Sequence, residues 1–212
     1  MRNIFTFLFS ITIIVACASN TDDVKNVTSD EIANSVAGKT DTAYFAGGCF
    51  WCVEASFEQI KGVKEAISGY SGGKQKKPTY KAVSYGKTDH AESVMVIYDP
   101  AVITYETLLD IFFTAHDPTQ LNRQGPDVGK QYRSAIFYTN EQEKKIAEEI
   151  MAALAPTFSE PIVTELKAFD FFHPAEDYHQ DFEKKNPNNT YIINVSKPKI
   201  DKVAEKFKDR LK

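Results

Sequence analysis

Strand-like and helix-like patterns alternate irregularly between residues 41 and 212, and this order limits the folds open to the chain. Val94, Val96 and Tyr98 alternate with their neighbours and Pro100 follows, which predicts a strand with a clear end. Strands are also predicted in residues 42–48, 63–73, 132–139 and 162–169, and helices in 53–60, 104–115, 140–154, 173–186 and 200–211. This mixture favours an α+β domain of two layers, with long functional loops around 68–90 and 116–131.

Local signals define the ends of several helices. Asn140 and Glu143 have the spacing of a capping box, and Pro174 stands where the first residue of a helix over 173–186 would be. In the tail, one helical stripe is predicted from Ile200, Val203, Phe207 and Leu211.

The N-terminus resembles an export signal. A basic Arg2 precedes an apolar run that is short for a membrane span and ends in small residues beside Cys17. We therefore expect residues 1–16 to be a signal peptide ending in a lipobox, with Cys17 as the lipid attachment site. The alternative is an ordinary secretory signal, in which this cysteine is discarded.

Residues 17–40 are polar and aperiodic, which predicts a flexible tether between the lipidated N-terminus and a domain at 41–212. This organisation implies a bacterial envelope protein, lipid-anchored on the exported side of the membrane and periplasmic in a Gram-negative host. A formal net charge of −4 excludes a broad basic surface, so nucleic acid is not an expected partner.

Residues 49–52, Cys-Phe-Trp-Cys, follow two glycines and have four interpretations. A zinc half-site requires two further soft ligands, and the remaining cysteine and the histidines show no suitable spacing, so no metal is expected. A structural disulfide fits an exported protein. The other two interpretations are a thioredoxin-like redox pair and a nucleophile with a resolving thiol. Both need Cys49 at a helix N-terminus, where the helix dipole favours its thiolate. The spacing of three residues then places Cys52 one helical turn away.

Six motifs occur in order between residues 43 and 187: "GGCFWC", "PTY" at 78–80, "HAE" at 90–92, "YDP" at 98–100, "HDP" at 116–118 and "GPDVGKQYRSAI" at 125–136. Together they resemble the A-type peptide methionine sulfoxide reductases. The resemblance implies a two-layer α+β sandwich with a split β-α-β, ferredoxin-like core. It also implies thiol-dependent reduction of the S epimer of methionine sulfoxide, in proteins and as the free amino acid.

The resemblance assigns catalytic roles to five residues. Cys49 is the nucleophile, Glu92 protonates the sulfoxide oxygen, and the hydroxyls of Tyr80 and Tyr132 donate to that oxygen. Asp127 orients the group or binds water. A carboxyl among aromatic rings loses hydration, so we expect a raised pKa for Glu92.

Phe50 and Trp51 are implied as the substrate-binding wall for the S-methyl group, since apolar rings suit a methyl and not an oxygen. The four histidines are interpreted as structural or exposed.

The chain departs from many family members, which carry a glycine at position 52 and a resolving cysteine near the C-terminus. Cys52 is then the resolving thiol expected here, closing a Cys49–Cys52 disulfide that thioredoxin or another dithiol reopens. No cofactor is expected, and the enzyme is expected to be a monomer that repairs oxidised proteins. The course of the tail beyond residue 185 is left open.

Two other functions remain open at this point. An envelope thiol–disulfide oxidoreductase would use the same Cys-x-x-Cys without Glu92, Tyr80 or Tyr132. A sulfoxide-binding lipoprotein would give no reason for the second cysteine. The sequence leaves the preferred substrate, the electron donor, the choice of inner or outer membrane and the oligomeric state undetermined.

Overall fold

A computed structural model of the chain describes residues 39–212. The predicted signal peptide, Cys17 and most of the predicted tether lie outside these residues. Within residues 39–212, no helix has both the length and the apolar character needed to cross a bilayer.

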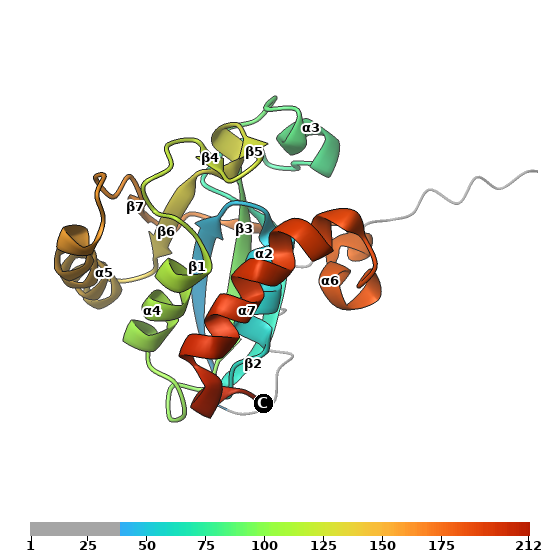
Figure 1. The fold of residues 1–212 in the computed structure, drawn as a ribbon. Helices are drawn as coiled ribbons and strands as arrows, with labels where there is room; N and C mark the ends of the chain where they lie inside the picture. Colours follow the sequence, from blue (N-terminus) through green and yellow to red (C-terminus); the bar gives the residue numbers. More distant parts are fainter. Residues whose placement is uncertain (1–38) are drawn as a thin grey trace, which may run out of the picture.

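A six-stranded sheet organises the domain, in the order β7-β6-β1-β3-β2-β8 (Figure 1). Its strands are β1 (Asp41–Gly47), β2 (Val63–Ser71), β3 (Ala91–Tyr98), β6 (Ser134–Tyr138), β7 (Glu165–Ala168) and β8 (Phe172–Pro174). All neighbours are antiparallel except β6 and β7. A separate two-stranded ribbon pairs β4 (Arg123–Gln124) with β5 (Asp127–Val128).

The helices are α2 (Phe50–Glu58), α3 (Tyr80–Ser84), α4 (Tyr105–Ala115), α5 (Glu141–Leu154), α6 (Phe182–Lys185) and α7 (Lys197–Lys206). Helix α2 connects β1 to β2, and α4 lies on the path from β3 to β6. Strand β3 inserts between β1 and β2 in the sheet, which is the expected split β-α-β core. The predicted α+β fold is therefore confirmed.

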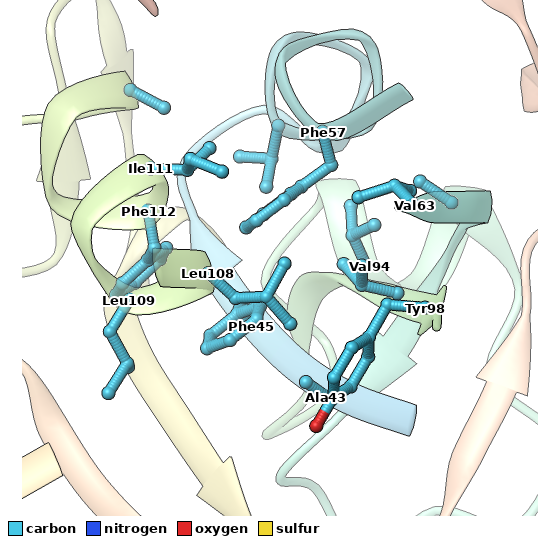
Figure 2. Packing of buried hydrophobic residues seen from close by; sticks show 14 of the residues in the cluster. Ala43, Phe45, Phe57, Val63, Val94, Tyr98, Leu108, Leu109, Ile111 and Phe112 are labelled. Atoms are coloured by element: carbon cyan, nitrogen blue, oxygen red, sulfur yellow. The ribbon is translucent and has the colours of Figure 1, made fainter. Parts of the chain in front are cut away.

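Alternation along β1 gives the sheet two buried faces. Ala43 and Phe45 point into the main core, whereas Tyr44 and Ala46 join a smaller cluster on the other face. In the main core the ring of Phe45 stacks on Phe57 of α2, with centroids 5.3 Å apart (Figure 2). Helices α2, α4 and α7 pack on this face, so the first turn of α2 is held between the sheet and the C-terminal helix.

The predicted helix over 173–186 is wrong. Pro174 instead ends the edge strand β8, opposite Gly69, where a residue without an N–H is tolerated. A 3₁₀ turn, η3 (Asp177–His179), and the short α6 follow. The Gln180 side chain bonds both the N–H and the C=O of Ser68, so tertiary contacts replace the helix that the local pattern suggested.

Three further segments differ from the sequence interpretation. The loop expected over 68–90 contains the end of β2 and helix α3, and the loop over 116–131 contains the β4–β5 ribbon. In the tail, α7 ends at Lys206, and Leu211 leaves the predicted stripe to form a β-bridge with Ile60. Asn140 caps α5 as predicted, since its Oδ1 accepts from the Glu143 N–H at 2.9 Å, but the Glu143 carboxylate accepts from the N–H and hydroxyl of Thr139 instead of the Asn140 N–H that a capping box requires.

Candidate active site

The two cysteines lie where β1 turns into α2. Strand β1 ends at Gly47, Gly48 takes a φ of +93°, and Cys49 is the N-cap residue of α2. Cys52 follows one turn later, and both are buried free thiols. The Cys49 and Cys52 side chains are hydrogen-bonded to each other. The turn thus presents two thiols at one end of the sheet, beneath α3 and the β4–β5 ribbon (Figure 1).

Burial and the contact between the two thiols change their pKa values in opposite directions. Burial raises the pKa of the Cys49 thiol well above its usual range. The pKa of Cys52 is lowered to about 7, first by the hydrogen bond with Cys49, with contributions from Lys199 and Ser196. In the substrate-free site burial therefore works against the thiolate that the sequence predicts at Cys49, and Cys52 is the more acidic thiol of the pair.

Glu92 lies on β3, next to the start of α2. Its carboxyl is 2% exposed, and Oε2 accepts from the Phe50 N–H at 3.2 Å. Burial raises the pKa of this carboxyl to about 8, against the lowering effect of that hydrogen bond. The direction is the one expected from the sequence, and the side chain is largely protonated at neutral pH. A neutral carboxyl here is a proton donor.

Tyr80, Tyr132 and Asp127 come from the elements that cover this end of the sheet. Tyr80 begins α3, and its N–H donates to Glu176 Oε1 at 2.9 Å. Tyr132 ends the 3₁₀ turn η1 (Lys130–Tyr132). Burial, with the charges of Glu92 and Cys49, raises the pKa of Tyr80 to about 12 and that of Tyr132 further, so both hydroxyls keep their protons.

Phe50 and Trp51 take different positions beside Cys49. The Phe50 ring is 1% exposed and belongs to the main core, stacked near Tyr80 at 6.3 Å. Trp51 is half-buried and stacks on Phe182 with ring centroids 3.8 Å apart. Phe50 therefore supports the site from below, and Trp51 offers the more exposed apolar wall.

His179 fixes the Trp51 ring. Trp51 Nε1–H donates to His179 Nδ1 at 3.1 Å, and the imidazole packs on Tyr80 with centroids 4.2 Å apart. An accepting Nδ1 requires a neutral ring, in agreement with burial lowering the pKa of His179 to about 4. The sequence placed this histidine among structural or exposed residues. It is structural, and it supports a proposed substrate wall.

Sequence reasoning missed two residues contributed by the tail. The Tyr191 hydroxyl donates to Asp127 Oδ2 at 2.6 Å and also contacts the Cys49 thiol. Ser196 Oγ lies 3.0 Å from Cys52 Sγ. Tyr191 precedes and Ser196 ends a π-helical turn, η4 (Ile192–Ser196), in a segment whose sequence carries no recognisable site motif. The structure thus brings the five predicted catalytic residues, Phe50, Trp51 and Cys52 to one place, together with these two; Cys17 lies outside the described residues.

Among residues 39–212, the one group of side chains with metal-binding spacing is Glu54, Glu58 and Asp181. Its members already serve the fold. Glu54 accepts from the Ser68 side chain and from the Asp181 N–H, and Glu58 pairs with Lys184. The two active-site thiols are not part of this group.

A comparison with family models matches residues 41–211 to the peptide methionine sulfoxide reductases. The peptide methionine sulfoxide reductase MsrA of Pasteurella multocida is 54% identical over 170 residues, which cover 80% of this chain and 98% of that protein. MsrA 2 of Synechocystis is 49% identical over 182 residues, covering 84% and 85%.

Solved structures give the same result. Reduced Mxr1 from Saccharomyces cerevisiae has a TM-score of 0.69 at 36% identity, covering 73% of this chain and 90% of that one. Methionine sulfoxide reductase A of Corynebacterium diphtheriae has a TM-score of 0.65 at 36% identity, covering 74% and 81%. Mxr1 has also been solved in complex with Trx2; that chain aligns with a TM-score of 0.51 at 26% identity, covering 69% and 87%.

Proposed function

The chain belongs to the peptide methionine sulfoxide reductase family and reduces methionine sulfoxide, and from this premise we propose which of its residues perform each step. One observation carries the assignment. A buried, largely protonated Glu92 is bonded to the first N–H of α2, directly beside the Cys49 thiol. A nucleophile and a proton donor therefore meet at one point.

In the first step the Cys49 sulfur bonds to the sulfoxide sulfur while Glu92 protonates the oxygen, which gives a four-coordinate sulfur that carries a hydroxyl. The hydroxyl then transfers to the Cys49 sulfur as the substrate's sulfur–oxygen bond and the transient sulfur–sulfur bond both break. Methionine leaves, and Cys49 is left as a sulfenic acid. Methionine sulfur gains two electrons and Cys49 sulfur loses two. Tyr80 and Tyr132 hold the oxygen by hydrogen bonds, and Asp127 is held in place by Tyr191.

Substrate-free Cys49 is a thiol, so its proton must leave before attack. The negative charge of the Cys52 thiolate opposes a second thiolate at Cys49, and the bound sulfoxide adds a positively polarised sulfur beside Cys49. Binding of that sulfur favours the Cys49 thiolate over the Cys52 thiolate. We therefore propose that substrate itself moves the charge of the pair to Cys49.

Orientation gives the choice of epimer. With the S-methyl group against Trp51 and the oxygen toward Glu92, Tyr80 and Tyr132, only one configuration at sulfur presents its sulfur to Cys49. We propose the S epimer. The test offers each pure epimer to the full chain with a dithiol reductant and follows methionine by chromatography. Equal conversion of the two epimers would overturn the orientation.

Cys52 is proposed to resolve the sulfenic acid as a Cys49–Cys52 disulfide. Without external thiol, a single turnover should yield one methionine and that disulfide, identified by peptide mass. A Cys52→Ser chain should still release one methionine but should stop as a sulfenic acid. Unimpaired steady turnover of Cys52→Ser with a thioredoxin-type reductant would contradict this role.

A thioredoxin-type dithiol is proposed as the reductant, supported by the structure of the relative Mxr1 with Trx2. The comparisons give no support to the rival thiol–disulfide oxidoreductase. Flavin or nicotinamide is not required by this chemistry, because thiols supply both electrons.

A lipid anchor at Cys17 and an envelope location are also proposed, on the sequence of residues 1–40 alone. The chain should incorporate labelled fatty acid in a bacterial host, and Cys17→Ala should abolish the label. Label retained by Cys17→Ala would contradict the anchor. Catalysis by the domain at 41–212 does not depend on this outcome.

A further inference from the structure

The Cys52 thiol has a second polar neighbour that the proposed cycle has not used. Ser196 Oγ lies 3.0 Å from Cys52 Sγ, and the two residues are 0% and 2% exposed. Within the described part of the chain, Cys52 is the one hydrogen-bond partner found for this hydroxyl. A buried hydroxyl directed at one sulfur is a specific arrangement, since buried polar groups seek a partner.

The π-helical turn accounts for this placement. Hydrogen bonds in a π-helix join residues five apart, so Tyr191 and Ser196 are stacked one turn from each other. Tyr191 reaches Cys49 and Ser196 reaches Cys52. In a regular α-helix, residues five apart point in different directions, and the two contacts could not be made by the same turn.

Lys199 adds a positive charge that acts on Cys52. Its Nζ atom is buried and has no hydrogen-bond partner among the described residues. Its charge acts on the Cys52 thiol and favours the thiolate. The charge of a buried ammonium group that has no carboxylate partner is not compensated, so it acts on neighbouring groups over a longer distance.

The resting site and the oxidised site differ in what holds Cys52. In the reduced pair the Cys49 S–H donates to Cys52. Once Cys49 has become a sulfenic acid, that S–H proton no longer exists, and the hydroxyl that replaces it is the group that leaves. Ser196 is then the side-chain donor to the Cys52 sulfur that lies outside the reacting pair.

We propose that Ser196, supported by the charge of Lys199, is a positioning residue for the resolving step: it donates to the Cys52 thiolate and directs that sulfur at Cys49. This inference rests on the proposed resolving role of Cys52. The Cys52 sulfur attacks the Cys49 sulfur, the sulfur–sulfur bond forms, and the sulfur–oxygen bond of the sulfenic acid breaks. The hydroxyl leaves as water, taking up the proton that Cys52 gives up on becoming a thiolate. The electron pair of the sulfur–oxygen bond leaves with the oxygen, and the two sulfurs of the disulfide share the two-electron oxidation.

Ser196→Ala tests the proposal, because alanine fits the same buried space without the hydroxyl. Ser56→Ala is the matched control: Ser56 is also 0% exposed, but its hydroxyl donates to the Cys52 carbonyl oxygen at 2.7 Å and not to the thiol. The full chain is given one equivalent of the substrate and quenched at intervals. Methionine release and the Cys49–Cys52 disulfide are measured separately, by chromatography and peptide mass.

Loss of a charge-assisted hydrogen bond raises a thiol pKa by about one unit. A less acidic thiol is also a better nucleophile, with a Brønsted slope of about 0.4–0.5. Disulfide closure in Ser196→Ala should therefore be about threefold slower than wild type at pH 6 and about threefold faster at pH 9. Methionine release should be unchanged at both values.

Ser196→Ala and wild type are compared at the same pH, so the titration of the other groups that face Cys52 affects both rates equally. These groups are Cys49, Glu92, Asp127, Tyr191 and Lys199. A second measurement uses Cys49→Ser chains and follows alkylation of Cys52 by peptide mass against pH. The midpoint should be about one unit higher when Ser196→Ala is added.

Three results would overturn the inference, and only one of them also removes the proposed function. Equal closure rates at every pH, or uniform slowing that Ser56→Ala reproduces, would leave Cys52 as the resolving thiol but Ser196 without a role. Absence of any Cys49–Cys52 disulfide in the wild-type chain would remove the resolving role and this inference with it.

Discussion

At the Glu92 carboxyl, burial and hydrogen bonding act on the proton in opposite directions. The Phe50 N–H favours the ionised form, and loss of hydration favours the neutral form by more. A protonated carboxyl accepts at one oxygen and donates from the other. With Oε2 bonded to the peptide N–H, the acidic proton belongs on Oε1, where it can be given to a substrate.

Replacing this proton donor should lower activity without loss of the fold. Glu92→Gln keeps the shape and the contact with Phe50 but removes the acid. We expect kcat to fall by about a hundredfold or more, the usual contribution of a positioned acid. Glu65→Gln, on an exposed position of β2, is the control and should match wild type. A Glu92→Gln chain within threefold of wild type would show that the proton comes from elsewhere.

The same variant should change stability in a pH-dependent way. Because the folded pKa of about 8 lies above the ordinary 4.5, the folded state holds the extra proton between these values. Wild-type stability therefore decreases as pH rises through this window, and glutamine removes that term. We expect Glu92→Gln to be more stable by on the order of 2 kcal/mol at pH 7 and by little at pH 4.5. Urea unfolding at several pH values measures it; an equal gain at all of them would contradict the cause.

At the scale of elements, the glycine turn before α2 sets the position of Cys49. Gly48 has a φ of +93°, and a Cβ there would lie 2.6 Å from the Cβ and Cγ atoms of Gln124. Gln124 in turn bonds the N–H and C=O of Asp117. The turn at Gly48 therefore packs against the Gln124 side chain, which two hydrogen bonds to the Asp117 backbone hold in place.

Gly48→Ala should cost about 3 kcal/mol of unfolding free energy, from backbone strain and the clash together. Gly125→Ala is the matched control, because Gly125 has a φ of +59° but open space around its Cβ position, and should cost about 1 kcal/mol. Activity should fall at least tenfold in the first variant and by less than threefold in the second. Similar losses in both would show that strain alone matters and that the contact with Gln124 does not.

The elements also show where sequence patterns succeed and fail. Helix α4 was predictable because its apolar spacing agrees with a capping Thr104 at its start. The helix predicted over 173–186 is wrong because a proline such as Pro174 is common both at the start of a helix and in an edge strand. Which of the two forms here depends on pairing with β2, about a hundred positions away in the sequence. Local patterns do not contain that partner.

For the whole molecule, the strand and helix order was sufficient to predict the α+β architecture, since alternation and loop signals are local. The family motifs supplied Cys49, Glu92 and the tyrosines as candidates. Tyr191 and Ser196 could not be predicted, because their roles depend on a π-helical turn and on the packing of the tail against α2. The burial that raises the pKa of Cys49 could not be predicted for a related reason: a helix start is visible in the sequence, and the depth of burial is not.

The tail that covers the two thiols is synthesised last, so the thiols of a growing chain are left uncovered for a time. Ser196 follows Cys52 by 144 residues, so at ribosomal rates roughly ten to thirty seconds pass between the two. Throughout that interval Cys49 and Cys52 exist without Tyr191 and Ser196 above them. Ribosome-bound chains stalled before residue 186 should therefore react with a small alkylating reagent at both cysteines much faster than the released protein. Equal protection in stalled and released chains would mean that the sheet and α3 shield the thiols unaided. Faster reaction in the stalled chains would mean that the two thiols are most exposed to oxidants during synthesis, before the enzyme is active.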